Sequence, residues 1–150
     1  MSTYSFLDCA AAIVGAGGSI NLAAGAAAAE EGISVEAAED KNVMTIGADG
    51  KGMHSLVANE ASAVTVRLLK TSPTNARLQM MYNLQTSSSL FHGKNTITIR
   101  DIARGDMIIL TQAAFKKRTP VTYAKEGGTM EWTFDAVRTV QTLGVGTPEL

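Results

Sequence analysis

The chain has 150 residues, of which 45% are hydrophobic, and a formal net charge of −1 at pH 7. This length and composition fit one domain, residues 1–150, with a buried core. No apolar run reaches the ~18 residues that span a membrane, and the N-terminus lacks the basic segment of a secretory signal. The single cysteine, Cys9, excludes an internal disulfide and fits a reducing cytoplasm.

The charges are distributed unevenly along the chain. Residues 1–40 contain six acidic side chains and no Lys or Arg, whereas the remaining residues contain eight acidic and all thirteen basic side chains. The two parts therefore carry −6 and +5, which sum to −1. We interpret this either as two solvated faces, or as an acidic surface that meets a basic surface of another copy or repels a polyanion. The acidic candidates are Glu30, Glu31, Glu36, Glu39 and Asp40, and the basic candidates are Lys116, Lys117 and Arg118.

The N-terminal third is expected to contain short strands joined by turns. Residues 4–14 are predicted as a first strand, and residues 19–22 as a second strand that returns after a glycine-rich turn. Residues 23–31 are ambiguous, because alanine favours helix while glycine interrupts it, and we expect a loop or a short helical turn. Residues 33–36 alternate as a short strand.

Residues 40–59 are predicted to form an extended hairpin. Residues 42–48 and 52–56 flank Asp49-Gly50, a dipeptide typical of type I′ hairpin turns. The hairpin is long for a monomer, and its apolar side chains suggest that a neighbouring subunit covers them. The candidate inter-subunit residues are Val43, Met44, Ile46, Asp49, Gly50, Met53 and Leu56.

The clearest pattern is a strand followed by the only convincing helix. Residues 62–69 alternate as a half-buried strand does. Ser72 is placed to cap a helix, and Pro73 fits the first helical position. We therefore expect a helix over about residues 73–85 that lies against a sheet. The broad apolar arc of this helix consists of Leu78, Met80, Met81, Tyr82 and Leu84.

The second half of the chain continues with alternating segments. Residues 95–101, 107–116 and 130–135 are predicted strands, and residues 121–124 a further candidate. Residues 137–150 have weak periodicity, and we expect an extended C-terminal arm there. Seven to nine short strands around one helix indicate a mainly β fold, an antiparallel sandwich or barrel. The expected core residues are Val64, Val66, Leu68, Leu78, Met81, Tyr82, Ile97, Ile99, Trp132 and Phe134.

The pattern closest to that of an enzyme is the glycine turn of residues 15–18. An apolar strand precedes it, and Glu36 lies about 20 residues further on, as in a dinucleotide-binding unit. However, Ile20 occupies the third glycine position, and the chain that follows does not alternate strands and helices. We therefore favour a turn between two antiparallel strands. Cys9 and the two histidines lack metal-ligand spacing, and we expect no catalytic, cofactor or metal site.

Several segments together resemble a known family. The strand–helix unit TVRLLKTSPTNARLQMMYNLQ is similar to that of tail tube proteins from contractile-tailed bacteriophages. The segments NVMTIGADGKGMHSL, NTITIRDIARGD and YAKEGGTMEWTFDA resemble the same family, as does the opening YSFLDCAAAIVGAGGSINLAAGAAAAEEGISVE. The resemblance covers nearly the whole chain and keeps its order.

The resemblance implies a structural subunit without enzymatic activity, located in the virion tail and assembled in the host cytoplasm. It implies hexameric rings stacked into a hollow tube, inside a contractile sheath, that conducts DNA. The implied partners are other copies of the chain, the sheath, baseplate and terminator proteins, and the tape measure protein and DNA, which occupy the lumen without specific binding. A tube initiator, terminator or baseplate protein, and the tube of a contractile bacteriocin, remain alternatives, as does a nucleotide-binding enzyme that uses Gly15–Gly18.

Overall fold

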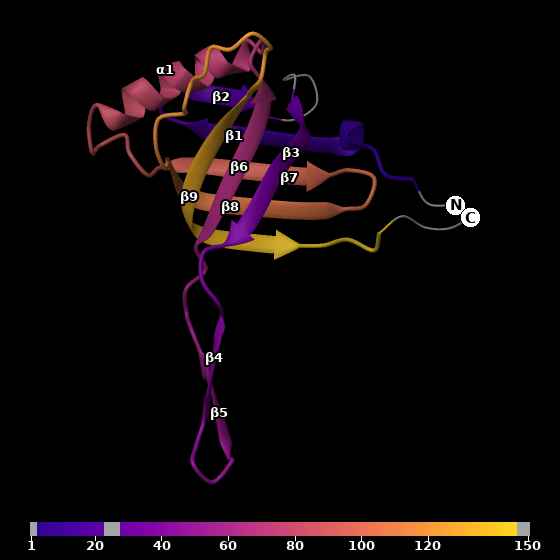
Figure 1. The fold of residues 1–150 in the computed structure, drawn as a ribbon, viewed down its shortest axis with the longest axis vertical. Helices are drawn as coiled ribbons and strands as arrows, with labels where there is room; N and C mark the ends of the chain where they lie inside the picture. The colour runs from indigo at the N-terminus through magenta and orange to yellow at the C-terminus, as the bar shows by residue number, and fades with distance from the viewer. Residues whose placement is uncertain (1–2, 23–27, 147–150) are drawn as a thin grey trace.

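The computed structural model describes residues 3–22 and 28–146, without the side chains of Phe6 and of residues 28–31. In these residues, seven strands form one antiparallel sheet in the order β2-β1-β7-β8-β9-β6-β3, and β4 and β5 form a separate hairpin (Figure 1). The predicted mainly β fold with one helix is confirmed. The elements are η1 (Phe6–Asp8), β1 (Cys9–Gly15), β2 (Gly18–Asn21), β3 (Ala28–Ala37), β4 (Asn42–Ile46), β5 (Gly52–Leu56), β6 (Ser62–Leu69), α1 (Thr74–Thr86), β7 (Asn95–Asp101), β8 (Asp106–Phe115) and β9 (Thr129–Thr142).

The sheet curls into a half-barrel because β9 belongs to two layers. Residues 129–136 of β9 pair with β6, whereas residues 134–142 pair with β8, so the two pairings overlap at only three positions. Figure 1 shows β3, β6 and the start of β9 crossing over β1, β7 and β8. In β8, Gln112 has a φ of 53°, and the register with β7 shifts near it. Such a bulge adds one residue to a strand and increases its bend.

The core lies between the two layers of the curled sheet and under α1. Alternating residues of β6, namely Val64, Val66 and Leu68, are fully buried, as the period of two predicts. The Phe115 ring contacts three other rings, with centroid distances of 4.7 Å to Phe134, 5.6 Å to Tyr82 and 6.0 Å to Trp132. Of the residues expected in the core, Leu78, Met81, Ile97, Trp132 and Phe134 are also buried, and Tyr82 and Ile99 are partly buried against it.

Helix α1 begins within one residue of its predicted start. Pro73 occupies the N-cap position, and the Thr74 N–H donates to Ser72 Oγ at 3.2 Å. The apolar arc is narrower than predicted, because Met80 and Leu84 are 72% and 41% exposed. A single sheet covers one stripe of the helix, so the outer part of a broad arc stays in solvent.

Two predictions in the N-terminal third, one of a strand and one of a loop or helical turn, are wrong. A 3-10 helix, Phe6–Asp8, precedes β1, so the first strand begins at Cys9 instead of Tyr4. Strand β3 already begins at Ala28, where we expected a loop or a helical turn. Backbone pairing with β6 outweighs the helical propensity of alanine there. Residues 23–27, which belong to the same ambiguous segment, lie outside the described residues.

Two predictions in the C-terminal third are also wrong. Residues 137–142 do not form an arm but continue β9 and pair with β8, with Val140 opposite Ile109. Residues 147–150, the end of the expected arm, lie outside the described residues. Residues 121–124 form a loop instead of a strand, with Lys70 Nζ donating to Thr122 O.

The predicted hairpin is present, but its turn differs from the predicted type. The Gly47 N–H donates to Lys51 O at 2.7 Å, and the Gly50 N–H to Gly47 O at 3.0 Å, which closes a five-residue loop. In this loop Gly50 alone has a positive φ, 88°. A type I′ turn needs a positive φ at both central residues, so the predicted turn type is wrong.

Among the described residues, no helix is long and apolar enough to cross a membrane.

Candidate assembly surfaces

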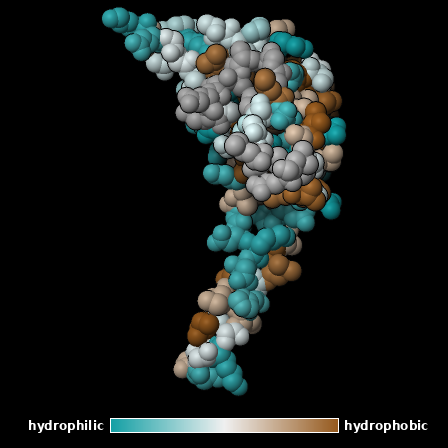
Figure 2. All heavy atoms as spheres, turned by 90° about the vertical axis from the view of Figure 1, so that its right-hand side faces the viewer, coloured by the Kyte–Doolittle hydropathy of each residue, from teal (hydrophilic) through white to brown (hydrophobic). Residues whose placement is uncertain are grey.

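The hairpin of β4 and β5 projects from the body of the molecule (Figure 1). Cross-strand partners share a face, so the register Met44↔His54 and Thr45↔Met53 assigns the residues of β4 and β5 to two faces. Apolar side chains lie on both faces, and all are at least half exposed. Figure 2 shows hydrophobic atoms at the surface of the hairpin on the side that it presents. One face carries Met44, Ile46 and Leu56, which are 59%, 56% and 85% exposed, and the other carries Val43 and Met53, which are 50% and 60% exposed.

This hairpin stands apart from the sheet of the body. Within the described residues, β4 and β5 pair only with each other. A two-stranded hairpin is marginally stable alone, and contiguous exposed apolar side chains mark interaction surfaces. The hairpin is therefore suited to contact other chains, and both of its faces have apolar side chains to be covered.

Acidic side chains gather where the hairpin leaves the body. In the sheet, Glu36 of β3 and Asp135 of β9 flank Ala63 of β6 from the two sides. Both carboxylates are exposed, as are those of Glu39 and Asp40 in the connection to β4. We call Glu36, Glu39, Asp40 and Asp135 the acidic base. Sequence reasoning missed Asp135, because only the register of β6 and β9 brings it to this place.

The side chains of two further acidic candidates, Glu30 and Glu31, lie outside the described part of the structure.

Basic side chains gather on the connection between β8 and β9, residues 116–128, which we call the basic loop. The candidates Lys116, Lys117 and Arg118 are exposed, and Lys125 further along is exposed too. The loop is fixed to the body: the Lys116 N–H donates to Thr133 O at 2.9 Å, and Thr119 Oγ1 to Glu131 O at 3.2 Å. Lys70, which follows β6, is a fifth basic side chain at this loop, because its Nζ lies 3.9 Å from the centroid of the ring of Tyr123, a residue of the loop.

Among the described residues, β2 and β3 are the two edge strands of the sheet. An edge strand presents unpaired backbone N–H and C=O groups, to which a strand of another chain can pair. The ten residues of β3 make the longer of these two edges.

The glycine turn connects antiparallel strands, as we favoured. Gly15 pairs with Gly18 at the end of β1 and β2, and Gly17 and Gly18 have φ values of 106° and 115°. The turn lies against Met81 and Leu84 of α1, whereas Glu36 lies at the hairpin end of β3. The structure therefore does not bring together the glycines and the acid that a dinucleotide site needs.

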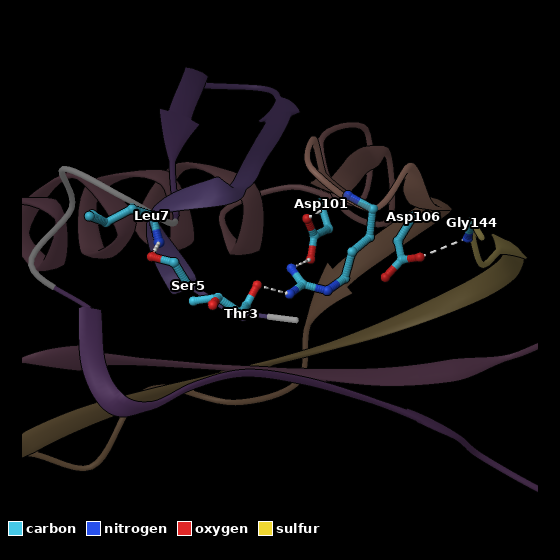
Figure 3. A network of polar contacts seen from close by, with 7 residues as sticks. Thr3, Ser5, Leu7, Asp101, Asp106 and Gly144 are labelled. Atoms are coloured by element: carbon cyan, nitrogen blue, oxygen red, sulfur yellow. Dashed lines mark hydrogen bonds and ion pairs between the residues drawn. The ribbon is translucent and has the colours of Figure 1, made fainter. Parts of the chain in front are cut away.

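Both terminal segments are held at the turn between β7 and β8 (Figure 3). The Arg104 guanidinium donates to Asp101 Oδ2 at 3.1 Å and to Thr3 O at 2.6 Å. On the other side, the Gly144 N–H donates to Asp106 Oδ1 at 2.7 Å. Burial and, to a lesser extent, the nearby Asp101 carboxylate raise the pKa of the Cys9 thiol. Sequence reasoning missed this network, and the D-x-x-R-x-D pattern around a turn is the signal that could have indicated it.

Among the described residues, no group of three His, Cys, Asp or Glu side chains could hold a metal ion.

Comparison with known proteins gives one family and several similar folds. The family described as "Bacteriophage PhiTE tail tube protein" matches residues 1–144. No curated protein sequence matches the chain.

Solved structures of contractile injection systems share the fold at low sequence identity. The tube-terminating cap of the anti-feeding prophage has a TM-score of 0.57 and 13% identity, covering 96% of this chain and 93% of that chain. The sheath/tube terminator of the extracellular contractile injection system PVC has a TM-score of 0.59 and 14% identity, covering 95% and 98%. A chain of the PVC sheath–tube complex has a TM-score of 0.54 and 12% identity, covering 95% and 99%.

Proposed function

Because the chain belongs to the bacteriophage PhiTE tail tube protein family, we propose that it is the subunit of a tail tube and that it self-assembles into stacked hexameric rings. The family match over residues 1–144 carries this proposal, and it supports a structural role. The exposed hairpin supports it independently, since its apolar side chains are at least half exposed and, among the described residues, its strands pair only with each other. In this proposal residues 1–150 act as one tail tube domain.

Two features of the fold suit the two kinds of contact that a stacked ring requires. Around the ring, the edge strands β2 and β3 extend the sheet from one subunit to the next, which leaves neither edge exposed. Between rings, the hairpin reaches from one subunit to the subunits of the next ring. Both contacts are heterologous: the first closes into a ring and the second repeats without closing.

The tube encloses a channel for phage DNA and lies within a contractile sheath, with baseplate and terminator proteins at its ends. Similar folds in the PVC sheath–tube complex and its terminator support partners of this kind. The proposed subunit acts in the virion tail after assembly in the host cytoplasm. The DNA and the tape measure protein pass through the channel without specific binding, because carboxylates at the channel wall repel phosphates.

A tube terminator is the second candidate. Two of the similar structures are described as a tube-terminating cap and a sheath/tube terminator, and they share the fold as well as the chain of the sheath–tube complex does. The two functions differ in homopolymer length, because a tube subunit adds ring upon ring whereas a terminator, an initiator or a baseplate protein forms a single ring. The tube of a contractile bacteriocin would also grow without limit, and only its sheath and cargo would distinguish it.

The test is sedimentation and negative-stain electron microscopy of the purified protein at rising concentration. The proposed function predicts hollow polymers whose length increases with concentration. Rings that never stack would support the terminator instead. A nucleotide-binding enzyme predicts saturable binding of NAD that Gly17→Trp abolishes, and we expect a flat titration for both the natural protein and this variant.

A further inference from the structure

The acidic base and the far end of the basic loop lie at opposite ends of β6, whereas the loop begins at Lys116 beside Thr133, which pairs with Thr65 in the middle of β6. Ser62, the first residue of β6, pairs with Ala37, which is next to Glu36 of the acidic base. Leu69, the last residue of β6, pairs with Thr129, and the Lys70 N–H donates to Gly128 O at the end of the basic loop. Eight residues of strand separate these ends, or roughly 25 Å at about 3.3 Å per residue.

The two patches carry opposite and nearly equal charge. The acidic base has four carboxylates, and the adjacent Lys41 reduces its charge to −3. The basic loop has four basic side chains and Glu126, which give +3, and Lys70 raises this to +4. Each patch is exposed, and its backbone is fixed by the strands that flank it.

Resting on the proposed function, we propose that the acidic base of one copy docks on the basic loop of the next copy along the tube. A shift along the axis of β6, by at most the length of this strand, brings the acidic base of one copy to the basic loop of the next. Figure 1 shows the hairpin pointing away from the body, on the side opposite the connection that leads into β9. After the same shift, the hairpin of one copy therefore lies alongside the body of the next copy, where both of its apolar faces can be covered.

The partner is a second copy because this chain itself supplies both complementary surfaces. A contact between two different patches of the same molecule is heterologous, and it generates an open polymer when the rotation does not close. A nucleic acid could bind the basic loop, but the carboxylates of the acidic base would repel its phosphates. A second copy of the chain complements both patches. The ionic contact also steers subunits into the correct polarity before the apolar side chains of the hairpin are buried.

Two charge-reversed variants test this proposal. The loop variant is Lys117→Glu with Arg118→Glu and Lys125→Glu, and the base variant is Glu36→Lys with Glu39→Lys and Asp40→Lys. All six side chains are exposed, so both variants should fold, which circular dichroism and a melting curve will check. In the loop variant both the loop and the acidic base are negative, and in the base variant both patches are positive. We therefore expect the concentration required for polymerisation to rise about tenfold or more for each variant alone.

Mixing the two variants provides the matched control. In an equimolar mixture, the glutamates introduced into the loop of one variant meet the lysines introduced at the acidic base of the other variant. The reverse contact, between the unchanged acidic base of the loop variant and the unchanged basic loop of the base variant, is complementary as well. We expect the mixture to polymerise near the concentration required by the natural protein, with the two variants alternating. Polymerisation of the natural protein should also weaken between 0.1 and 1 M salt, because the Debye length falls from about 10 Å to about 3 Å.

The outcomes separate this proposal from the proposed function. If the natural protein polymerises and each variant alone polymerises equally well, the docking contact is overturned while the tube function stands. Loss of DNA retention by the loop variant, with normal polymerisation, would assign the basic loop to nucleic acid instead. If the natural protein never polymerises, the proposed function is overturned, and the docking contact with it.

Discussion

Gln85 near the end of α1 and Asn95 at the start of β7 exchange two amide hydrogen bonds. Gln85 Nε2 donates to Asn95 Oδ1 at 2.7 Å, and Asn95 Nδ2 donates to Gln85 Oε1 at 2.6 Å. Both side chains are buried, and Gln85 Nε2 also donates to Ala16 O at 2.8 Å. This pair therefore ties the helix, the glycine turn and the sheet together while satisfying polar atoms that would be costly if left unpaired.

Replacing Gln85 with alanine should reduce the free energy of unfolding by about 2–3 kcal/mol, because it leaves the Asn95 amide and Ala16 carbonyl without their buried partner. The matched control is Gln79→Ala, which removes the exposed 2.9 Å bond to Asn83 in the same helix. Its effect should be about 0.5 kcal/mol or less. Urea unfolding measures both changes, and equal losses for the two variants would contradict the role of the buried pair.

Gly15→Ala should destabilise the fold through the same pair. An added Cβ would lie 1.8 Å from Asn95 Oδ1, so the amide must move and break its bonds to Gln85. We expect a loss of about 2–3 kcal/mol, in the range of overpacking substitutions. Gly127→Ala is the control, because nothing lies within 4 Å of its added Cβ. In a double-mutant cycle, Asn95→Ala should remove most of the cost of Gly15→Ala, and full additivity would argue against this clash.

The sequence allowed prediction of those elements whose local pattern agrees with their final environment. Residues 62–69 and 95–101 alternate because one face of each strand packs on the core, and β6 and β7 have the predicted bounds. The helix start was predictable from Ser72 and Pro73, whose effect is confined to neighbouring backbone groups.

The predictions failed where tertiary pairing decides the structure. Residues 137–142 have little apolar alternation, and β8 fixes them as a strand through backbone bonds that every residue type except proline can make. The alanines of β3 favour helix locally, yet β6 pairs with them. The acidic base could be predicted only in part, because Asp135 reaches it through the register of three strands.

Substitutions on either face of the hairpin should impair assembly without affecting the folded monomer. The variants are Met44→Ser with Ile46→Ser for one face, and Val43→Ser with Met53→Ser for the other. Each buried apolar side chain contributes about 1.5–3 kcal/mol, so we expect each pair to raise the concentration required for polymerisation tenfold or more. Light scattering measures this change.

Two observations control this experiment. The melting temperature of each hairpin variant should match that of the natural monomer, since these side chains are exposed. Thr45→Ser on the same hairpin should assemble normally. If either double variant polymerised like the natural protein, the face that it alters would not be covered by another copy.

The Cys9 thiol should react slowly with iodoacetamide in the folded protein. Burial and then the Asp101 carboxylate raise its pKa above the ordinary value of 9.0, so a smaller fraction is thiolate at pH 8 than in the unfolded chain. The rate should therefore continue to rise with pH above 9.0, and Asp101→Asn should shift the profile to lower pH. A rate profile with its midpoint at or below that value in the folded protein would show that burial does not disfavour the thiolate.

A cryo-electron microscopy reconstruction of the polymer formed by the purified protein tests the central claim most directly. The account predicts a hollow tube of stacked rings in which each β4–β5 hairpin lies against another copy, with apolar side chains of both faces covered. Single rings that do not stack, or a tube in which the hairpin stays in solvent, would contradict it.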